Sequence, residues 1–189
     1  MKKITVALDL DGVIWDLVHP WVEEYNRRYD DNLTYEGVTS YDLTKHMVKC
    51  RKEDYCHILT EPEFWQIVEP FEGNVEWLKK LNCKYNIVIA TKTDFRVFEM
   101  KVKRVLELFP FMKHSQIICI HDKSLLNVDW LVDDCLDNLN GGIFNAIVYD
   151  APYNKTDKYL RVENLEQVYY LLEQYYNESK EKKWKDTKF

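Results

Sequence analysis

The sequence has few of the features that mark secreted or membrane-bound proteins. Its five cysteines are odd in number and contain no Cys-x-x-Cys pair, which disfavours a disulfide framework and a zinc site. No apolar run approaches the roughly 20 residues needed to cross a bilayer. A predicted strand begins within the first few residues, so we expect no signal peptide. We therefore expect a cytoplasmic protein with free, mostly buried thiols and no membrane partner.

Basic charge and repeated segments are also scarce. The chain carries 26 Lys and Arg against 32 Asp and Glu, a net charge of −6, which argues against a nucleic-acid polymer as its main partner. Low-complexity segments and internal repeats are absent. The 189 residues, with 13 Tyr and 6 Trp, suffice for one domain with a large core and an inserted lobe. Whether the chain is a monomer or a homodimer stays open.

Strands and helices alternate along most of the chain. Apolar runs predict strands at 3–9, 85–91, 116–120, 129–132 and 146–149. Amphipathic spacing predicts helices at 74–81, 95–109 and 163–176. This alternation favours an α/β fold with a Rossmann-like parallel sheet in three layers, joined by right-handed crossovers.

One stretch, residues 15–70, breaks the alternation. It contains a predicted helix over 16–29, a polar turn-rich segment over 30–50, a helix over 52–60 and a turn or helix start near Pro62. We expect a small helical cap, inserted after the first strand. The core then comprises residues 1–14 and 71–176, and residues 177–189 form a charged, frayed tail.

The segment Asp9-Leu10-Asp11-Gly12, directly behind the first strand, is the most informative part of the chain. Alternate residues of a strand point the same way, so Asp9 and Asp11 leave the sheet together and repel each other. Such a pair is costly unless a cation or a reacting group uses it. Ligands of open α/β sheets bind just beyond the carboxyl ends of the strands. The pair therefore indicates a site.

Other predicted strand ends supply further polar groups. Thr91 ends the second strand, Lys123 follows the third, and Asp133 and Asp134 end the fourth. In a parallel sheet these ends share one edge, so the groups can converge. Carboxylates suit a hard divalent ion such as Mg²⁺, and the cation with Lys123 and Thr91 would suit a phosphate.

The order of these motifs resembles the haloacid dehalogenase superfamily of phosphotransferases. More narrowly, Asp122-Lys123-Ser124 followed by Trp130-Leu131-Val132-Asp133-Asp134 resembles the 5'(3')-deoxyribonucleotidase family, and the helical insertion matches that family's cap. The resemblance covers roughly residues 3–172. It implies a Mg²⁺-dependent phosphomonoesterase with a core of the haloacid dehalogenase type. The partner it implies is a small-molecule nucleoside monophosphate.

The resemblance also implies roles for individual residues. Asp9 would be the nucleophile that forms an aspartyl-phosphate, and Asp11 the general acid and later the base. Thr91 and Lys123 would bind the phosphoryl oxygens. The metal ligands implied are Asp9, the backbone carbonyl of Asp11, and Asp134, with Asp133 as a further ligand or a neighbour of one.

Some positions depart from the family pattern. Lys92 stands where relatives often carry Ser, and it either adds phosphate affinity or points to solvent. Leu17 stands where the animal enzymes tend to have an aromatic residue that stacks on the base, so a pyrimidine preference is in doubt. Phe64 and Trp65 are candidates for contact with the base, and the alternative is that they pack inside the cap.

Three other functions stay open on the sequence. The first is a phosphatase of the same superfamily for another small metabolite, and the second is a non-catalytic nucleotide-binding module. The third is a polynucleotide end-processing phosphatase, although the net negative charge and the lack of a basic stripe argue against it. The complete set of acids argues against the second, because a decayed enzyme usually loses Asp9 or Asp11. The base, the sugar and the choice between a 5' and a 3' phosphate do not follow from the sequence.

Overall fold

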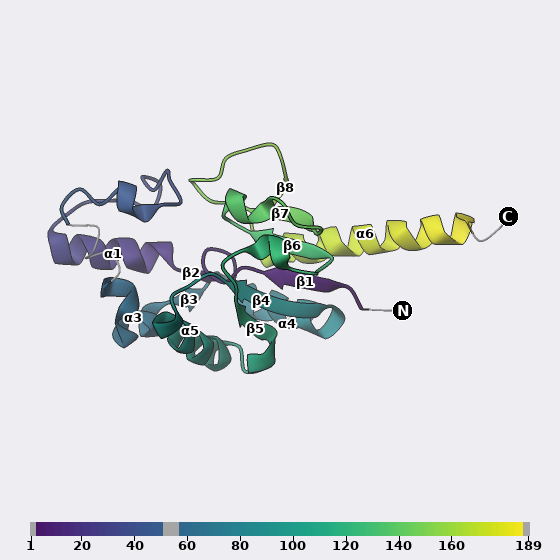
Figure 1. The fold of residues 1–189 in the computed structure, drawn as a ribbon, viewed down its shortest axis with the longest axis horizontal. Helices are drawn as coiled ribbons and strands as arrows, with labels where there is room; N and C mark the ends of the chain where they lie inside the picture. The colour runs from purple at the N-terminus through teal and green to yellow at the C-terminus, as the bar shows by residue number, and fades with distance from the viewer. Residues whose placement is uncertain (1–2, 51–56, 187–189) are drawn as a thin grey trace.

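The computed structural model describes residues 3–50 and 57–186. A six-stranded parallel sheet of order β5-β4-β1-β6-β7-β8 forms its centre (Figure 1). The strands are β1 (Thr5–Leu8), β4 (Asn86–Thr91), β5 (Ile117–Cys119), β6 (Trp130–Asp133), β7 (Asn145–Tyr149) and β8 (Leu160–Val162). The sheet confirms the predicted α/β fold. β8 was not predicted, because three residues carry too little periodicity.

Alternate residues of the central strands separate into two apolar clusters, as the two-residue period of a strand requires. Val6 and Leu8 of β1 belong to the larger cluster, which contains residues of the long helices. Ala7 lies in the smaller one, beside Leu131 and Leu139. The strands are buried on both faces, as parallel strands usually are.

Three long helices and three short 3-10 helices accompany the sheet. They are α4 (Asn74–Lys84), α5 (Phe95–Leu108), α6 (Leu165–Asp186), η2 (His114–Gln116), η3 (Lys123–Leu125) and η4 (Leu136–Leu139). α6 extends well past the sheet (Figure 1), whereas the sequence predicted its end at residue 176. The added segment lacks Gly and Pro and is rich in Glu and Lys, which favour helix. Its charge had indicated a frayed tail, and that expectation is wrong as far as Asp186.

The described part of residues 15–70, called the cap from here on, lies at one end of the sheet (Figure 1). The cap contains α1 (Val18–Tyr29), η1 (Leu43–Lys45) and α3 (Pro62–Ile67). Its two ends meet in a short antiparallel pair, β2 (Trp15–Asp16) with β3 (Glu69–Pro70). Residues 57–60 are helical, and the start of the helix expected from Lys52 lies outside the described residues.

Four of the cysteines lie in the described ranges, and Cys83, Cys119 and Cys135 are free thiols. Cys135 is buried, but Cys83 and Cys119 are exposed, so the expectation of mostly buried thiols is wrong. Cys83 occupies an outward position of α4, and Cys119 ends the edge strand β5. Cys56 lies outside the described residues. None of the helices described here has the length and apolarity to cross a membrane.

Candidate active site

Two neighbouring strands bring the predicted acids together. β1 pairs with β6, and the Asp9 amide extends this ladder by donating to the Val132 carbonyl at 2.9 Å. Asp9, Asp133 and Asp134 are all buried, and each offers a carboxylate oxygen within 4.8 Å of the others. The convergence expected at this edge of the sheet is thus present in the structure.

Lys123 lies between two of these acids. Its Nζ donates to Asp9 Oδ1 and Asp133 Oδ2, both at 2.6 Å, and its side chain is fully buried. Burial alone would lower the pKa of Lys123, but Asp9 and Asp133 outweigh it and hold the pKa above its ordinary value. Lys123 therefore stays charged and neutralises part of the acidic cluster.

The cluster keeps an excess of negative charge. Burial raises the pKa of Asp9 to about 7; Lys123 opposes the shift, while Asp133 and Asp11 add to it. Burial, followed by Asp9 and Asp133, also raises the pKa of Asp134 well above its usual range. These shifts mean that three buried acids share one ammonium group. A divalent cation would relieve the repulsion that remains.

The two neighbouring acids of β6 differ in their surroundings. Asp133 is fully engaged, because it accepts from Lys123, from the Cys135 amide at 2.9 Å and from Asn138 Nδ2 at 3.0 Å. In Asp134, Oδ2 accepts from the Tyr153 hydroxyl, whereas the buried Oδ1 has no hydrogen-bond partner among the described residues.

A buried, unpartnered carboxylate oxygen is costly in a folded protein. In this position, beside two other acids, it matches the oxygen ligands that Mg²⁺ prefers. The residues present therefore fit a hard divalent ion.

Asp11 is not one of the three clustered acids. Its carboxylate forms an ion pair with Lys101 and accepts from the Trp15 indole at 2.8 Å. The next residue, Gly12, has φ +74°, and a Cβ there would overlap Asp134 Oδ2. Only glycine lets the loop pass this close to Asp134 in that conformation. The loop thus presents Asp9 and Asp11 to different surroundings.

Lys101 is a site residue that the sequence analysis missed. It lies on α5, is 3% exposed, and its Nζ donates to Asp11 Oδ2 and, at 3.3 Å, to Thr91 Oγ1. The ammonium group also lies 5.3 Å from the centre of the Trp65 ring. The sequence did contain a weak indication of this role, because Lys101 has the helical spacing that places it with Val97 and Val105 on the buried face of α5. A charge on such a face needs a buried partner.

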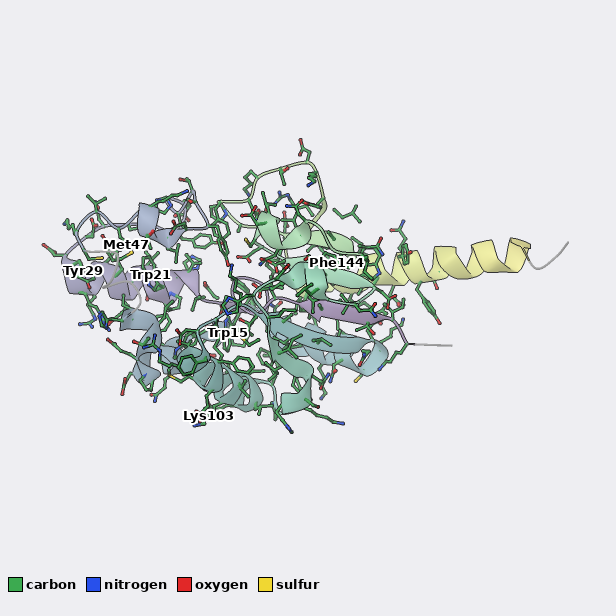
Figure 2. All side chains as sticks on the ribbon, viewed as in Figure 1. Trp15, Trp21, Tyr29, Met47, Lys103 and Phe144 are labelled. Carbon is green, nitrogen blue, oxygen red and sulfur yellow. The ribbon has the colours of Figure 1, made fainter. Side chains whose placement is uncertain are left out.

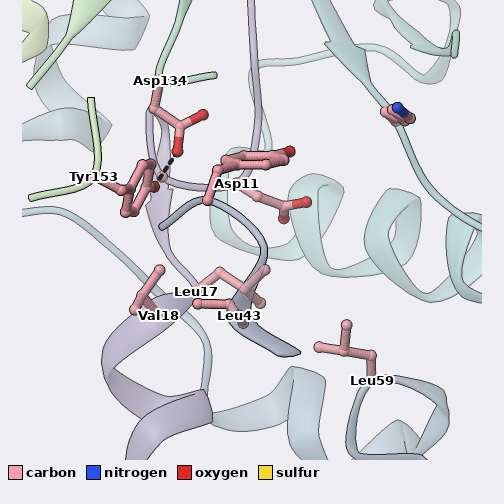
Figure 3. A pocket seen from close by; sticks show the side chains of 10 residues that line it. Asp11, Leu17, Val18, Leu43, Leu59, Asp134 and Tyr153 are labelled. Carbon is pink, nitrogen blue, oxygen red and sulfur yellow. Dashed lines mark hydrogen bonds between the residues drawn. The ribbon is translucent and has the colours of Figure 1, made fainter. Parts of the chain in front are cut away.

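A pocket opens beside Asp11 and Asp134 (Figure 3). Its open space is about 640 Å³, counting the part exposed to solvent. Polar and apolar groups both line it: Asp11, Gly12, Leu17, Val18, Tyr41, Leu43, Leu59, Lys92, Asp134 and Tyr153. Thr91 is buried at the end of β4, while the neighbouring Lys92 is exposed at the pocket. Burial and the Asp134 carboxylate raise the pKa of Tyr153, so its hydroxyl is protonated and donates.

Phe64 and Trp65 do not line this pocket. They are 3% and 2% exposed and contact each other edge to face. The Trp65 ring lies 5.8 Å from that of Trp15, and its indole donates to the Leu59 carbonyl at 2.9 Å. Figure 2 shows Trp15 where the cap meets the core. The structure thus places both rings among buried residues of the cap, and Trp65 also lies against Lys101 of α5.

Sequence comparison identifies relatives over nearly the whole chain. A family model described as "5' nucleotidase, deoxy (Pyrimidine), cytosolic type C protein" matches residues 2–176. A relative from Clostridium acetobutylicum named 5'(3')-deoxyribonucleotidase is 35% identical over 160 residues, covering 83% of this chain and 87% of the relative. These matches confirm the resemblance drawn from the motifs.

Solved structures share the fold at low sequence identity. A haloacid dehalogenase-like hydrolase from Streptococcus pneumoniae superposes with a TM-score of 0.61 at 13% identity, covering 89% of this chain and 98% of that one. A hydrolase of the same type from Deinococcus radiodurans, described with bound phosphate and sodium, gives a TM-score of 0.56 at 14% identity, with coverages of 90% and 95%. The fold is therefore that of the haloacid dehalogenase core.

Proposed function

Because this chain belongs to the 5'-nucleotidase family described as the deoxy (pyrimidine), cytosolic type C protein, we propose that it is a Mg²⁺-dependent phosphomonoesterase that hydrolyses (deoxy)ribonucleoside monophosphates. The observation that carries this proposal is the cluster of Asp9, Asp133 and Asp134 around the buried Lys123, next to an open pocket. Both similarity and chemistry point to phosphoryl transfer at this edge of the sheet.

In the proposed reaction, an oxygen of Asp9 attacks the phosphorus atom. The bond from phosphorus to the leaving alcohol breaks, and that alcohol takes a proton from Asp11, which enters this step protonated; an aspartyl-phosphate remains on Asp9. A water molecule then attacks the phosphorus atom and gives a proton back to Asp11, while the bond from phosphorus to the Asp9 oxygen breaks. Inorganic phosphate leaves, and both acids return to their starting states. Asp11 suits its role because it lines the pocket, held by Lys101 and Trp15.

In this proposal two acids of the cluster bind the metal, and the third positions Lys123. Asp9, Asp134 and the backbone carbonyl of Asp11 would hold Mg²⁺. When bound, the ion offsets the repulsion between the anionic nucleophile and the phosphate and stabilises charge during transfer. Asp133 is already satisfied by protein donors, so we assign it to positioning Lys123.

The phosphate would be bound by groups at the end of β4 and in η3. Lys123 and Thr91 would contact its oxygens, and Lys92 would add positive charge at the mouth of the pocket. For the nucleoside, we favour the pocket wall formed by Leu17, Tyr41 and their neighbours over Phe64 and Trp65, whose rings are covered. Packing of the cap would exclude water during transfer.

We also propose that the enzyme works in a reducing cytosol on a small-molecule substrate. The free thiols at Cys83, Cys119 and Cys135 support a reducing compartment. The net charge of −6 is compatible with a nucleotide substrate when a local cation and Lys123 offset it.

The test is a phosphate-release screen over 5' and 3' nucleoside monophosphates, deoxy and ribo, with Mg²⁺ or with EDTA. We expect Mg²⁺-dependent release from nucleotides and loss of turnover by at least about 10³-fold in Asp9→Asn, since this variant lacks the nucleophile. Circular dichroism checks that the variant folds. A preference for another small phosphate would indicate the related metabolite phosphatase, and binding without release would indicate a non-catalytic module. Equal turnover in Asp9→Asn and the parent would remove the covalent mechanism.

A further inference from the structure

Tyr153 lies between the acidic cluster and the cap. It belongs to the connection between β7 and β8, and its hydroxyl donates to Asp134 Oδ2 (Figure 3). The same ring meets Tyr41 of the cap edge to face, with centroids 5.8 Å apart and planes at 70°. None of the sequence motifs assigned a role to this residue.

The loop that carries Tyr153 is fixed to the residue that Tyr153 contacts. The neighbouring Asn154 is buried, and its Nδ2 donates to the backbone carbonyls of Asp134 and Tyr149, both at 2.7 Å. Arg161 Nη1 donates to Asn154 Oδ1 at 2.9 Å. Tyr153 and Asp134 therefore keep a fixed separation, set by the backbone rather than by the phenol alone.

The phenol hydrogen bond makes the two oxygens of Asp134 unequal. Oδ2 accepts the hydrogen bond from the Tyr153 hydroxyl, and only glycine at position 12 leaves room for this oxygen. Oδ1 is buried and unpartnered, beside the carboxylates of Asp9 and Asp133. A rotation of the Asp134 carboxylate would break the phenol hydrogen bond and misplace Oδ1.

We propose that Tyr153 is a positioning residue that fixes Asp134 with its free Oδ1 directed at a divalent cation. This inference rests on the metal site of the proposed function. Groups that hold a metal ligand in place, without touching the metal, affect its affinity strongly, because a loose carboxylate must be ordered when the ion binds. The contact with Tyr41 supports this role, since it restrains the ring on the cap side.

The experiment measures Mg²⁺ binding directly by titration calorimetry with magnesium chloride on the full chain, without substrate. For Tyr153→Phe we expect a dissociation constant about 10- to 100-fold weaker than that of the parent. Steady-state kinetics over a range of Mg²⁺ concentrations should show the same defect as a higher Mg²⁺ concentration needed for half-maximal activity. Tyr153→His, which keeps a ring N–H donor, is expected to retain more of the affinity than Tyr153→Phe.

Tyr159→Phe is the matched control, because it also removes a phenol hydrogen bond. The Tyr159 hydroxyl donates to Asn140 Oδ1 at 2.6 Å, and Tyr159 does not line the pocket. We expect its Mg²⁺ affinity to equal that of the parent. Melting curves in EDTA establish that each variant is folded before titration.

The outcomes separate this inference from the proposed function. A Tyr153→Phe variant that binds Mg²⁺ as well as the parent, or more tightly, overturns the positioning role alone. A parent that does not bind Mg²⁺ overturns both the metal site and the positioning role. A parent that binds Mg²⁺, with weakened binding in Tyr153→Phe but no phosphate release from any monophosphate, supports the positioning role and rejects the nucleotidase.

Discussion

Replacing Lys123 with methionine is expected to destabilise the metal-free protein strongly. Lys123 is 1% exposed, and its Nζ donates to Asp9 and Asp133 at 2.6 Å each. Methionine fills similar apolar space but carries no charge and no N–H donor. The substitution would therefore leave two buried carboxylates without their cation.

The size of the effect follows from this burial. Removing one partner of a buried ion pair costs about 3–5 kcal/mol in the free energy of unfolding. For a chain of 189 residues each kcal/mol shifts Tm by about 2–4 °C, which gives a decrease of roughly 6–20 °C. Protonation of Asp9 relieves part of the cost, since its pKa is already about 7. The decrease should therefore be larger at pH 8 than at pH 5.

The assay is thermal unfolding in EDTA at both pH values, followed by circular dichroism. The double variant Lys123→Met/Asp133→Asn removes one of the two buried carboxylate charges that have lost their cation. We therefore expect its Tm to be higher than that of Lys123→Met. Lys103→Met is the control for losing a lysine. Lys103, labelled in Figure 2, is 75% exposed on α5 and pairs with Glu99 at 2.7 Å. Exposed pairs contribute little, so this variant should melt with the parent.

A Lys123→Met protein that melts with the parent in EDTA at pH 8 would refute the reasoning. It would mean that Asp9 and Asp133 do not need the ammonium group to remain buried. A double variant less stable than Lys123→Met would also contradict it, because the charge at Asp133 would then not be the source of the cost.

Two further predictions concern pH and the buried lysine of α5. The folded-state pKa of Asp9, about 7, lies above its unfolded value of about 3.9, so this group favours the folded state at low pH and less so as pH rises through 7. In EDTA, Tm should fall between pH 5 and pH 8. Mg²⁺ should raise Tm more at pH 8 than at pH 5. A rise in Tm between pH 5 and pH 8 in EDTA would contradict the raised pKa of Asp9. Lys101→Met should lower kcat by about 10²-fold with little change in KM, because Lys101 holds the proposed acid Asp11, and Lys101→Arg should recover part of it. Steady-state kinetics at saturating Mg²⁺ measure kcat and KM of both variants. An unchanged kcat in Lys101→Met would show that Lys101 does not position Asp11.

The sequence predicted the parts of the site that lie on strands. Asp9, Thr91 and Asp133 occupy strand ends, and a parallel sheet brings such ends to one edge whatever the length of chain between them. Apolar runs locate strands well, so the convergence followed from β1, β4 and β6 without any knowledge of side-chain contacts.

The residues that were missed lie where local sequence carries little information. Lys101 faces inward from a helix, and Tyr153 belongs to an irregular loop. Their partners, Asp11 and Asp134, are 90 and 19 residues away in the sequence, so only the tertiary fold reveals these contacts. The surroundings of Phe64 and Trp65 were equally hidden, because aromatic residues serve packing and ligand contact alike.

The direction of α6 has a practical consequence for handling the protein. This helix leaves the sheet on the side opposite the cap and reaches Asp186 far from the pocket (Figure 1). A fusion partner or surface linker attached after this helix would leave the substrate entrance unobstructed. Enzyme that is immobilised through its carboxyl end should therefore have the same kcat as the free enzyme.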